Sequence, residues 1–309
     1  MLTIRLLVIG GGGFIGQHVT VHALNLGWEV TSLGLTERRF SGVKCMVADI
    51  ANFEVLRQTL RETRFDYVVN CGGYIDHAQF KSGGRRLIDT HFSGLLNLVE
   101  LLDRSSLKRF VNIGSSDEYG AVAEPQSEWA REAPISPYSL AKVAAVHFLQ
   151  MMYRTESFPA VTLRLFLTYG PGQDKSRLIP QIIHGCLENR SFPVSGGDQL
   201  RDFCYVEDTV RAIFATLRTS AADGQIVNLG SGFGVSIRSV VERVCDIIGG
   251  GVPQFGVLPY RPCENMALYA DVTQAAKLLC WSPRVDLETG LKLTIDACRK
   301  TTWRSNRSC

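Results

Sequence analysis

Leu6-Leu-Val-Ile-Gly-Gly-Gly-Gly-Phe-Ile-Gly16 decides the fold, because four apolar residues run directly into a cluster of glycines. The apolar run predicts a buried strand over Leu6–Ile9, and the following segment predicts a helix over Phe14–Leu26. Glycines between a strand and a helix allow a tight turn, close approach of the backbone to a pyrophosphate, and close helix–strand packing. Two phasings fit: Gly10, Gly13 and Gly16, or Gly11, Gly13 and Gly16. We therefore expect the N–H groups that open the helix, around Phe14 and Ile15, to face a dinucleotide.

Strand and helix patterns alternate outward from this turn to residue 165. The predicted strands are Leu6–Ile9, Glu29–Leu33, Val43–Val47, Asp66–Cys71, Lys108–Ile113 and Val161–Leu165. Between them we predict helices over Phe14–Leu26, from the N-cap Asn52, over residues 83–104 and over Pro137–Tyr153. This alternation is typical of α/β proteins and predicts a Rossmann-type, doubly wound parallel sheet.

The rhythm changes after Tyr169-Gly-Pro-Gly172. The remaining predicted elements are helices at Leu178–Leu187, Asp208–Arg218, Ile237–Ile248 and Asp271–Leu279, a strand at Gln225–Leu229, and a loop-rich stretch at Phe192–Arg201. We expect residues 1–167 to form a dinucleotide-binding domain to which residues 208–230 return. Residues 168–207 and 231–309 would then form a smaller C-terminal substrate-binding lobe.

Composition excludes several classes of protein. The 309 residues are 45% hydrophobic and 20% charged with a net charge of +3, which is ordinary for a soluble protein and too weak to indicate a nucleic-acid partner. The apolar opening contains Arg5 and ends in glycines, so it predicts a buried strand, and no segment predicts a membrane partner. Nine scattered cysteines and six histidines show no ligand spacing, so we expect no metal and a reducing, cytoplasmic location.

Tyr138-Ser-Leu-Ala-Lys142 carries the candidate chemistry. Its i, i+4 spacing on a helix places the phenol and the ammonium side by side. A phenol with a pKa of about 10 needs a neighbouring cation to exchange protons near neutrality, and Lys142 would be that cation. Ser115 or Ser116, at the end of a predicted strand, could hold a substrate oxygen against the phenol. The spacing also suits an ordinary amphipathic helix, but the dinucleotide turn favours proton transfer coupled to hydride transfer.

The end of the second strand bears on the cofactor. An acidic residue usually holds the adenosine ribose diol there, but this position is Gly34, and Arg38 and Arg39 follow shortly after it. This pattern favours NADP(H), whereas Glu37 leaves NAD(H) possible.

Other residues would complete the cofactor site. Asp49 and Ile50 follow the third strand and are placed to flank the adenine, and Gly72 follows the fourth strand, where a small residue lets the cofactor lie close. The helix over Pro137–Tyr153 has small or apolar residues almost all round, which predicts a homodimer.

Taken together, the motifs resemble the extended short-chain dehydrogenase/reductases, in particular the NAD-dependent epimerase/dehydratase family that acts on nucleotide sugars. The resemblance covers nearly the whole chain and rests on Gly10–Gly16, Asp49, Ser115 with Ser116, Tyr138 with Lys142, Tyr169–Gly172, Arg201-Asp-Phe203, Tyr260-Arg261 and Trp281–Pro283. It implies that Tyr138 and Lys142 perform the proton chemistry, with Lys142 also on the nicotinamide ribose. The family register selects Ser115 as the catalytic hydroxyl.

The same resemblance implies a nucleotide-diphosphate sugar as substrate. Arg201 and Arg261 match positions that hold the diphosphate, while surface salt bridging is the alternative for both, and Thr168 and Leu178 fall at further substrate-binding positions. Three departures from the family pattern are Leu167 and His91, where asparagine is usual, and Gly34.

Ser116-Asp117-Glu118 bears on the reaction. Dehydratases of the family place an Asp–Glu pair after the catalytic hydroxyl, but counting back from Tyr119 puts Asp117 in the glutamate position and Ser116 in the aspartate position. This spacing is closer to the 4-keto-6-deoxy sugar reductases, with Asp117 as a further catalytic candidate and Glu118 as either a polar loop residue or a site residue. An NAD-dependent 4-epimerase is the main alternative, followed by a 4,6-dehydratase or a non-catalytic relative that senses the cofactor.

Overall fold

Residues 3–38, 40–260 and 264–305 are described in the computed structural model of this chain. Within them, seven strands form a parallel sheet in the order β11-β6-β5-β4-β1-β2-β3. These are Arg5–Ile9 (β1), Glu29–Gly34 (β2), Val43–Val47 (β3), Tyr67–Asn70 (β4), Arg109–Ser115 (β5), Ala160–Leu165 (β6) and Ile226–Leu229 (β11). The chain starts at β1, runs to one edge, and returns to extend the other edge. The predicted doubly wound sheet is confirmed.

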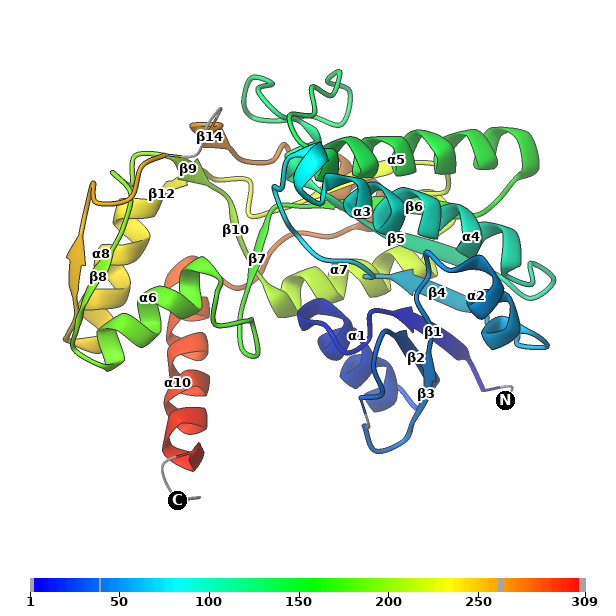
Figure 1. The fold of residues 1–309 in the computed structure, drawn as a ribbon, viewed down its shortest axis with the longest axis horizontal. Coiled ribbons are helices and arrows are strands. Elements are labelled where there is room, and N and C mark those ends of the chain that lie inside the picture. The colour runs from blue at the N-terminus through cyan, green and yellow to red at the C-terminus, as the bar shows by residue number, and fades with distance from the viewer. Residues whose placement is uncertain (1–2, 39, 261–263, 306–309) are drawn as a thin grey trace.

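Helices cover both faces of the sheet (Figure 1). One face carries α1 (Phe14–Asn25), α7 (Val206–Arg218) and α9 (Thr273–Leu279), and the other carries α2 (Phe53–Leu60), α4 (Gly94–Leu101) and α5 (Pro137–Glu156). Alternate strand residues point to opposite faces. Val8 therefore packs in the core under α1 and α7, whereas Leu7 packs in the core under α4 and α5. Burial on both sides explains why these strands are apolar throughout.

The predicted helix over residues 83–104 is interrupted. It divides into α3 (Gly84–Ile88), a π-helical turn over Asp89–Ser93, and α4. Such π turns occur frequently at functional sites. Here the turn carries His91, whose ring centroid lies 5.0 Å from that of Tyr138 on α5.

A smaller lobe lies beside the sheet, built on its own apolar core (Figure 1). That core joins α6 (Leu178–Leu187), α8 (Ile237–Ile248) and α10 (Leu287–Ser305). Its short strands are Leu167–Tyr169 (β7), Ser191–Pro193 (β8), Leu200–Arg201 (β9), Phe203–Tyr205 (β10), Val235–Ser236 (β12), Val252–Gln254 (β13) and Ala267–Leu268 (β14). The helix α10 was not predicted from the sequence. It contributes Leu291 and Ile295, both fully buried, to this core.

Helix α9 corrects the predicted division of the chain. We expected residues 231–309 in the smaller lobe, but α9 packs against the main sheet and α7. Ala275 and Leu279 of this helix, with Trp281 just after it, belong to the core on the α1 face. The indole N–H of Trp281 donates to the carbonyl O of Asp208 at the start of α7. The C-terminal region therefore crosses back to the first lobe before α10 returns to the second.

Candidate active site

The glycine turn after β1 is shaped by Gly10, Gly13 and Gly16. Gly10 adopts a left-handed φ of 71°, and its carbonyl O accepts a 2.8 Å hydrogen bond from the N–H of Gly13. A Cβ on Gly16 would overlap the carbonyl O of Gly10, so close packing of α1 on the turn requires glycine there. Gly11 faces Ser32 instead. The structure thus selects the first phasing, and Phe14 and Ile15 open α1 directly above the turn.

Three segments meet the glycine turn at the carboxyl edge of the sheet. A Cβ on Gly10 would lie 2.8 Å from the carbonyl O of Cys71, and one on Gly72 would lie 2.8 Å from Ile9 and 3.6 Å from Ile50. Asp49 is exposed next to Ile50 and accepts a hydrogen bond from the N–H of Ala51. Gly10, Gly72 and Ile50 are therefore brought together as the sequence predicted, with Asp49 at the rim.

Arg38 lies across the glycine turn. Its Nη1 donates a 2.7 Å hydrogen bond to the carbonyl O of Gly12, and its side chain is exposed. Gly34 at the end of β2 has no atom within 4 Å of the position that a Cβ would take. Arg39 lies outside the described residues. The place where a ribose-binding carboxylate is usual thus has open space, and Arg38 of the following loop reaches the glycine turn instead.

Tyr138 and Lys142 lie on one face of α5, close to the end of β5. Pro137 is the first residue of this helix, as the sequence predicted, and the structure adds Ser136 as its N-cap. Tyr138 is 3% exposed and Lys142 is 7% exposed. Nζ of Lys142 lies 5.9 Å from the Tyr138 ring centroid and donates a 2.6 Å hydrogen bond to the carbonyl O of Ile113.

The electrostatics of this pair differ from the expectation. Burial raises the pKa of Tyr138, the charge of Asp117 raises it further, and a hydrogen bond with the Ser115 side chain lowers it. Burial also lowers the pKa of Lys142 to about 8, against the opposing effect of Glu118. The pKa of Tyr138 is thus raised and not lowered in this structure, because burial outweighs the other influences on the phenol. That Lys142 stabilises the phenolate during the reaction stays a prediction.

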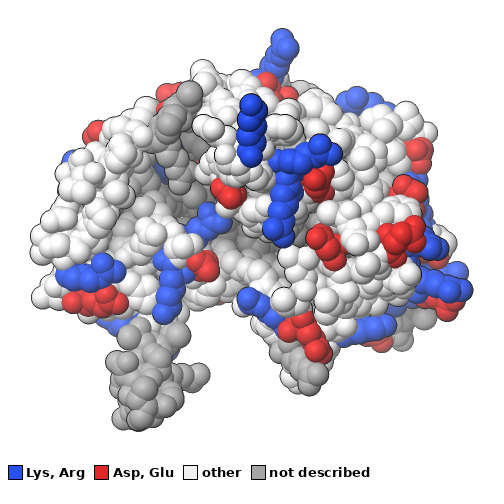
Figure 2. Space-filling model, viewed as in Figure 1, with Lys and Arg blue, Asp and Glu red and all other residues white. Residues whose placement is uncertain are grey.

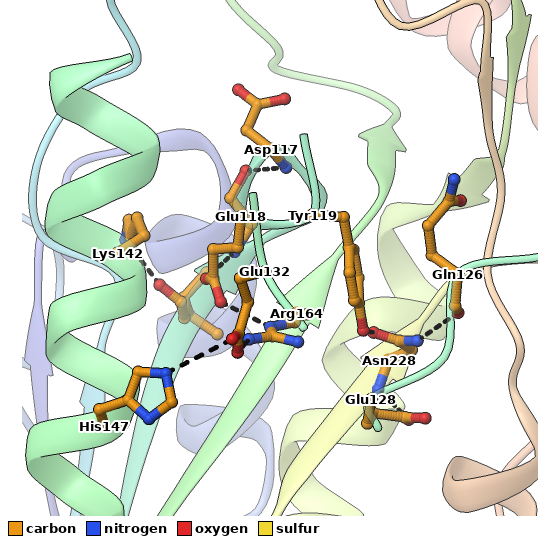
Figure 3. Close-up of polar contacts among 12 residues, drawn as sticks. Asp117, Glu118, Tyr119, Gln126, Glu128, Glu132, Lys142, His147, Arg164 and Asn228 are labelled. Carbon is orange, nitrogen blue, oxygen red and sulfur yellow. Dashed lines mark hydrogen bonds and ion pairs between the residues drawn. The ribbon is translucent and has the colours of Figure 1, made fainter. Parts of the chain in front are cut away.

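The four polar residues from Ser115 to Glu118, at the end of β5, lie in different surroundings. Ser115 is within hydrogen-bonding reach of Tyr138, and its Oγ also accepts from the N–H of Asp117 at 3.2 Å. Ser116 is buried, and Asp117 extends from the short 3₁₀ turn with its side chain 33% exposed. Glu118 points inward and is fully buried against Arg164 (Figure 3). Glu118 is therefore neither a loop residue nor a group that reaches substrate.

Two histidines surround Tyr138. Nε2 of His77 lies 3.8 Å from Oδ2 of Asp117, and its ring centroid lies 6.3 Å from that of Tyr138. The sequence analysis missed His77, although it follows a strand that ends at the carboxyl edge.

His91 packs edge-on against Tyr138, and its Nε2 lies 2.8 Å from the carbonyl O of Tyr74. Burial and the charge of Lys142 lower the His91 pKa to about 3, so this ring is neutral and Nε2 carries the proton that Tyr74 accepts. Its Nδ1 is buried and has no hydrogen-bond partner in the described part of the chain.

The predicted substrate residues lie in the second lobe or at its border. Arg201 forms an ion pair with Glu264 and donates from Nη1 to the carbonyl O of Leu200 at 2.7 Å. Oγ1 of Thr168 lies 3.2 Å from Oγ1 of Thr209, inside the protein. Leu178 opens α6 and packs on the lobe core. Arg261 lies outside the described residues.

The surface between the two lobes is hollowed, and charged side chains of both signs, Lys and Arg as well as Asp and Glu, stand at its border (Figure 2). Within the described ranges, no cluster of three or more His, Cys, Asp or Glu side chains is arranged to hold a metal ion. Among the described helices, none combines the length and apolar character needed to cross a bilayer.

A doubly wound parallel sheet with a glycine turn after β1 and a Ser–Tyr–Lys group at its carboxyl edge defines a short-chain dehydrogenase/reductase. The sequence profile of the NAD dependent epimerase/dehydratase family matches residues 6–230, so the chain belongs to that family. The predicted resemblance is confirmed.

Known proteins resemble the chain over almost all of its length. It is 26% identical to dTDP-glucose 4,6-dehydratase 1 of Escherichia coli K12, over 98% of this chain and 95% of that protein. It is 29% identical to the UDP-glucuronate 4-epimerase of Thermodesulfobacterium geofontis, over 94% of each. The crystal structure of UDP-glucose 4-epimerase with UDP-glucose from Thermotoga maritima superimposes with a TM-score of 0.88 at 27% identity, covering 97% of this chain and 100% of that one. The protein is thus an enzyme of the NAD-dependent nucleotide-sugar epimerase/dehydratase type.

Proposed function

We propose that the protein reduces the C4 ketone of a nucleotide-linked 4-keto-6-deoxy hexose with NADPH. The observation that carries this proposal is Arg38, whose guanidinium donates to the carbonyl O of Gly12 in the glycine turn, together with Gly34 at the end of β2, where a carboxylate is usual. An arginine in this loop suits a ribose that bears a 2′-phosphate, whereas Glu37 beside it in the chain is the residue that would bind a free ribose diol instead. A reductase must exchange its cofactor in every cycle, and NADPH is the usual donor for biosynthetic reduction.

The residues at the carboxyl edge fit a dinucleotide. The turn at Gly10, Gly13 and Gly16 leaves no room for a Cβ at its closest points, and α1 begins directly after it, so the free N–H groups of the first helical turn would bind the pyrophosphate. When bound there, the nicotinamide supplies a hydride for C4. Residues 1–167, with residues 208–230, would bind this cofactor, and the second lobe would bind the sugar nucleotide.

In this mechanism Ser115 and Tyr138 hold the O4 atom between their hydroxyls. Tyr138 donates its proton to O4 as C4 receives the hydride, so the ketone becomes a hydroxyl and the phenol becomes a phenolate. The ammonium of Lys142 stabilises that phenolate and the oriented ribose. Burial raises the Tyr138 pKa, so the phenol is protonated at neutral pH, and the nearby charge of Lys142 is needed to stabilise the phenolate as the proton leaves.

The acidic residues argue against dehydration. Elimination of water from the sugar needs an acid and a base beyond Tyr138, and the family's dehydratases take both from consecutive carboxylates. Here Ser116 occupies the first position and Glu118 is withdrawn into an ion pair with Arg164, so Asp117 alone remains near the site. One carboxylate suits substrate orientation better than elimination.

Arg201 and Arg261 would hold the diphosphate of the substrate. The relatives act on dTDP- and UDP-linked sugars, and Lys and Arg are among the charged side chains around the hollow between the lobes (Figure 2). Arg201 is partly buried and already oriented by Glu264, so it could form charge-assisted hydrogen bonds to phosphate oxygens.

The test follows nicotinamide absorbance with NADPH and a nucleotide-linked 4-keto-6-deoxy hexose, together with the cofactor content of the purified protein. We expect stoichiometric oxidation of NADPH and formation of the 4-hydroxy sugar. Tightly bound NAD, with epimerised sugar and no net NADPH oxidation, would establish a 4-epimerase instead. Cofactor binding without turnover of any sugar nucleotide would indicate a sensor.

We also propose that the enzyme is a homodimer assembled through α5. Leu140 and Met151 of this helix are 50% and 41% exposed, and burial of such apolar surface favours association. Sedimentation equilibrium of the protein and of a Leu140→Glu/Met151→Glu variant tests this, with a dimer expected only for the unmodified chain.

A further inference from the structure

Glu118 is a fully buried carboxylate that the mechanism above does not use. Its Oε1 accepts a 2.8 Å hydrogen bond from the N–H of Ser115, and its Oε2 accepts a 2.5 Å charge-assisted bond from Nε of Arg164 (Figure 3). Both side chains are 0% exposed. A buried ion pair of this kind adds little to stability compared with apolar side chains, so its presence calls for another reason.

Two buried side chains, Glu118 and Lys142, form hydrogen bonds with the backbone at the end of β5. Glu118 binds the N–H of Ser115, while Lys142 binds the carbonyl O of Ile113 two residues earlier. Gly114 stands between them, and a Cβ there would lie 2.7 Å from Oε1 of Glu118. Ser115 also caps the turn by accepting from the N–H of Asp117, so its backbone and its side chain are both fixed.

Arg164 is itself held in place. It lies on β6 in register with Gly114 of β5, directly beside the end of that strand. Its guanidinium stacks 4.6 Å from the ring centroid of Tyr119 and forms a second ion pair with Glu132, which is 12% exposed. Nε2 of His147 on α5 lies 3.4 Å from Oε2 of Glu132 (Figure 3). The guanidinium that pairs with Glu118 is therefore held in place by β6, by the ring of Tyr119 and by the carboxylate of Glu132.

We propose that Glu118 and Arg164 form a positioning pair that holds Ser115 against Tyr138 and supplies the negative charge facing Lys142. Neither residue touches the reacting atoms. The proposal rests on the roles given above to Ser115, Tyr138 and Lys142. The proposal assigns a function to Glu118, which in the sequence resembles one member of the Asp–Glu pair of the dehydratases.

The surroundings of Lys142 make the electrostatic part of this proposal testable. The titratable groups that face it are Glu118, Cys71, Tyr138 and His91. Glu118 is the larger of the two influences that raise the Lys142 pKa against burial, and Cys71 is the smaller. Removal of the Glu118 charge should therefore lower the Lys142 pKa further below about 8.

The main test compares Glu118→Gln, Glu118→Val and the double variant Glu118→Val/Arg164→Met. The double variant replaces the pair by apolar groups, so it should melt near the temperature of the unmodified protein. We expect its kcat to fall by at least about tenfold with KM for the sugar nucleotide nearly unchanged, because Ser115 loses its support. Glu118→Gln keeps an acceptor for the N–H of Ser115, so its kcat should lie between that of Glu118→Val and that of the unmodified protein.

A matched control lies at the other end of the same strand. Arg109 and Asp223 form a largely buried ion pair with a 2.8 Å contact between Nε and Oδ1. Arg109→Met/Asp223→Val removes a comparable pair far from Tyr138 and should leave kcat and its pH profile unchanged.

The second readout does not depend on which sugar reaction the enzyme performs. ¹⁵N NMR of the Lys142 ammonium, recorded without substrate, should show a lower pKa in both Glu118→Gln and Glu118→Val than in the unmodified protein. The proposal would be overturned if the double variant had the kcat of the unmodified protein. It would also be overturned if the Lys142 pKa in Glu118→Val were unchanged, and the pair would then be purely structural. Lack of keto-sugar reduction by the unmodified protein would overturn the proposed function alone, and the NMR comparison would still decide the role of Glu118.

Discussion

Lys142 donates a 2.6 Å hydrogen bond from Nζ to the carbonyl O of Ile113, which ties the cation of α5 to the end of β5. The bond satisfies one of three donors on a side chain that is almost completely buried. Burial accordingly lowers the pKa of this lysine to about 8. The protein thus keeps a costly charge in its interior, at the position where the proposed chemistry needs it.

Lys142→Met is expected to stabilise the protein at neutral pH. The unfolded lysine has a pKa of about 10.4, so between pH 8 and 10.4 the unfolded chain binds more protons and the free energy of unfolding rises with pH. Below pH 8 the full cost of the buried charge applies, on the order of 3 kcal/mol. Urea denaturation should show a gain for Lys142→Met at pH 7 that shrinks by pH 10. Lys44→Met, at an exposed position of β3, is the control and should show no such pH dependence.

Tyr138→Phe is expected to remove the proton donor without disturbing the glycine turn. Turnover should fall by at least about a hundredfold while the dissociation constant for the dinucleotide stays nearly constant, as expected for a lost general acid. Steady-state kinetics and fluorescence titration of NADPH measure the two quantities. Near-normal turnover would show that another group donates the proton.

His91→Asn is expected to protect the protein against acid. The folded pKa of His91 is about 3 and the unfolded value is about 6.5, so the stability that its neutral form contributes is complete above pH 6.5 and is lost as pH falls toward 3. Between pH 6.5 and 4 the loss is on the order of 3 kcal/mol.

Urea denaturation at pH 7 and pH 4 should show a smaller loss for His91→Asn than for the unmodified chain. His147→Asn is the control, since that side chain is 59% exposed. An imidazole NMR signal of His91 that titrates near pH 6.5 would contradict this prediction.

Arg38→Ala is expected to raise KM for NADPH more than KM for NADH. The guanidinium is exposed and donates to the carbonyl O of Gly12 in the turn, so its removal should affect a ligand phosphate more than the fold. Charge-assisted bonds of this type are worth about 1.5 to 3 kcal/mol, or roughly ten- to hundredfold in the ratio of the two KM values. Arg57→Ala, on the exposed face of α2, is the matched control. Equal increases in KM for NADPH and for NADH would show that Arg38 does not select between the two cofactors.

Arg201→Ala is expected to weaken binding of the sugar nucleotide by about 2 kcal/mol while the dinucleotide is unaffected. Glu264→Gln should have the opposite effect, because Glu264 forms an ion pair with the guanidinium that we assign to the diphosphate. Isothermal titration of both variants with UDP-glucose and with NADPH separates the effects. Equal losses for both ligands in Arg201→Ala would make the arginine structural.

The sequence by itself determined the features that depend on neighbours along the chain. Apolar runs separated by helical periods predicted the alternating strands and helices, and Gly10, Gly13 and Gly16 predicted the turn, because backbone conformation and periodicity are local properties. The i, i+4 spacing of Tyr138 and Lys142 placed both on one helix face for the same reason. Pro137 marked the start of that helix, because proline has no N–H to leave unpaired at the first helical position.

Only the tertiary structure decided what surrounds those residues. Glu118 and Arg164 are 46 residues apart in sequence, and the pairing of β5 with β6 brings them together as a buried ion pair. Glu118 is therefore not one of two catalytic carboxylates, as its place after Asp117 could have indicated. Tertiary packing likewise decided the contact of His91 with Tyr138 and the placement of α9 on the main sheet. Burial also reversed the expected balance at Tyr138 and Lys142, since desolvation depends on every element packed around a group and leaves no mark in the spacing of residues.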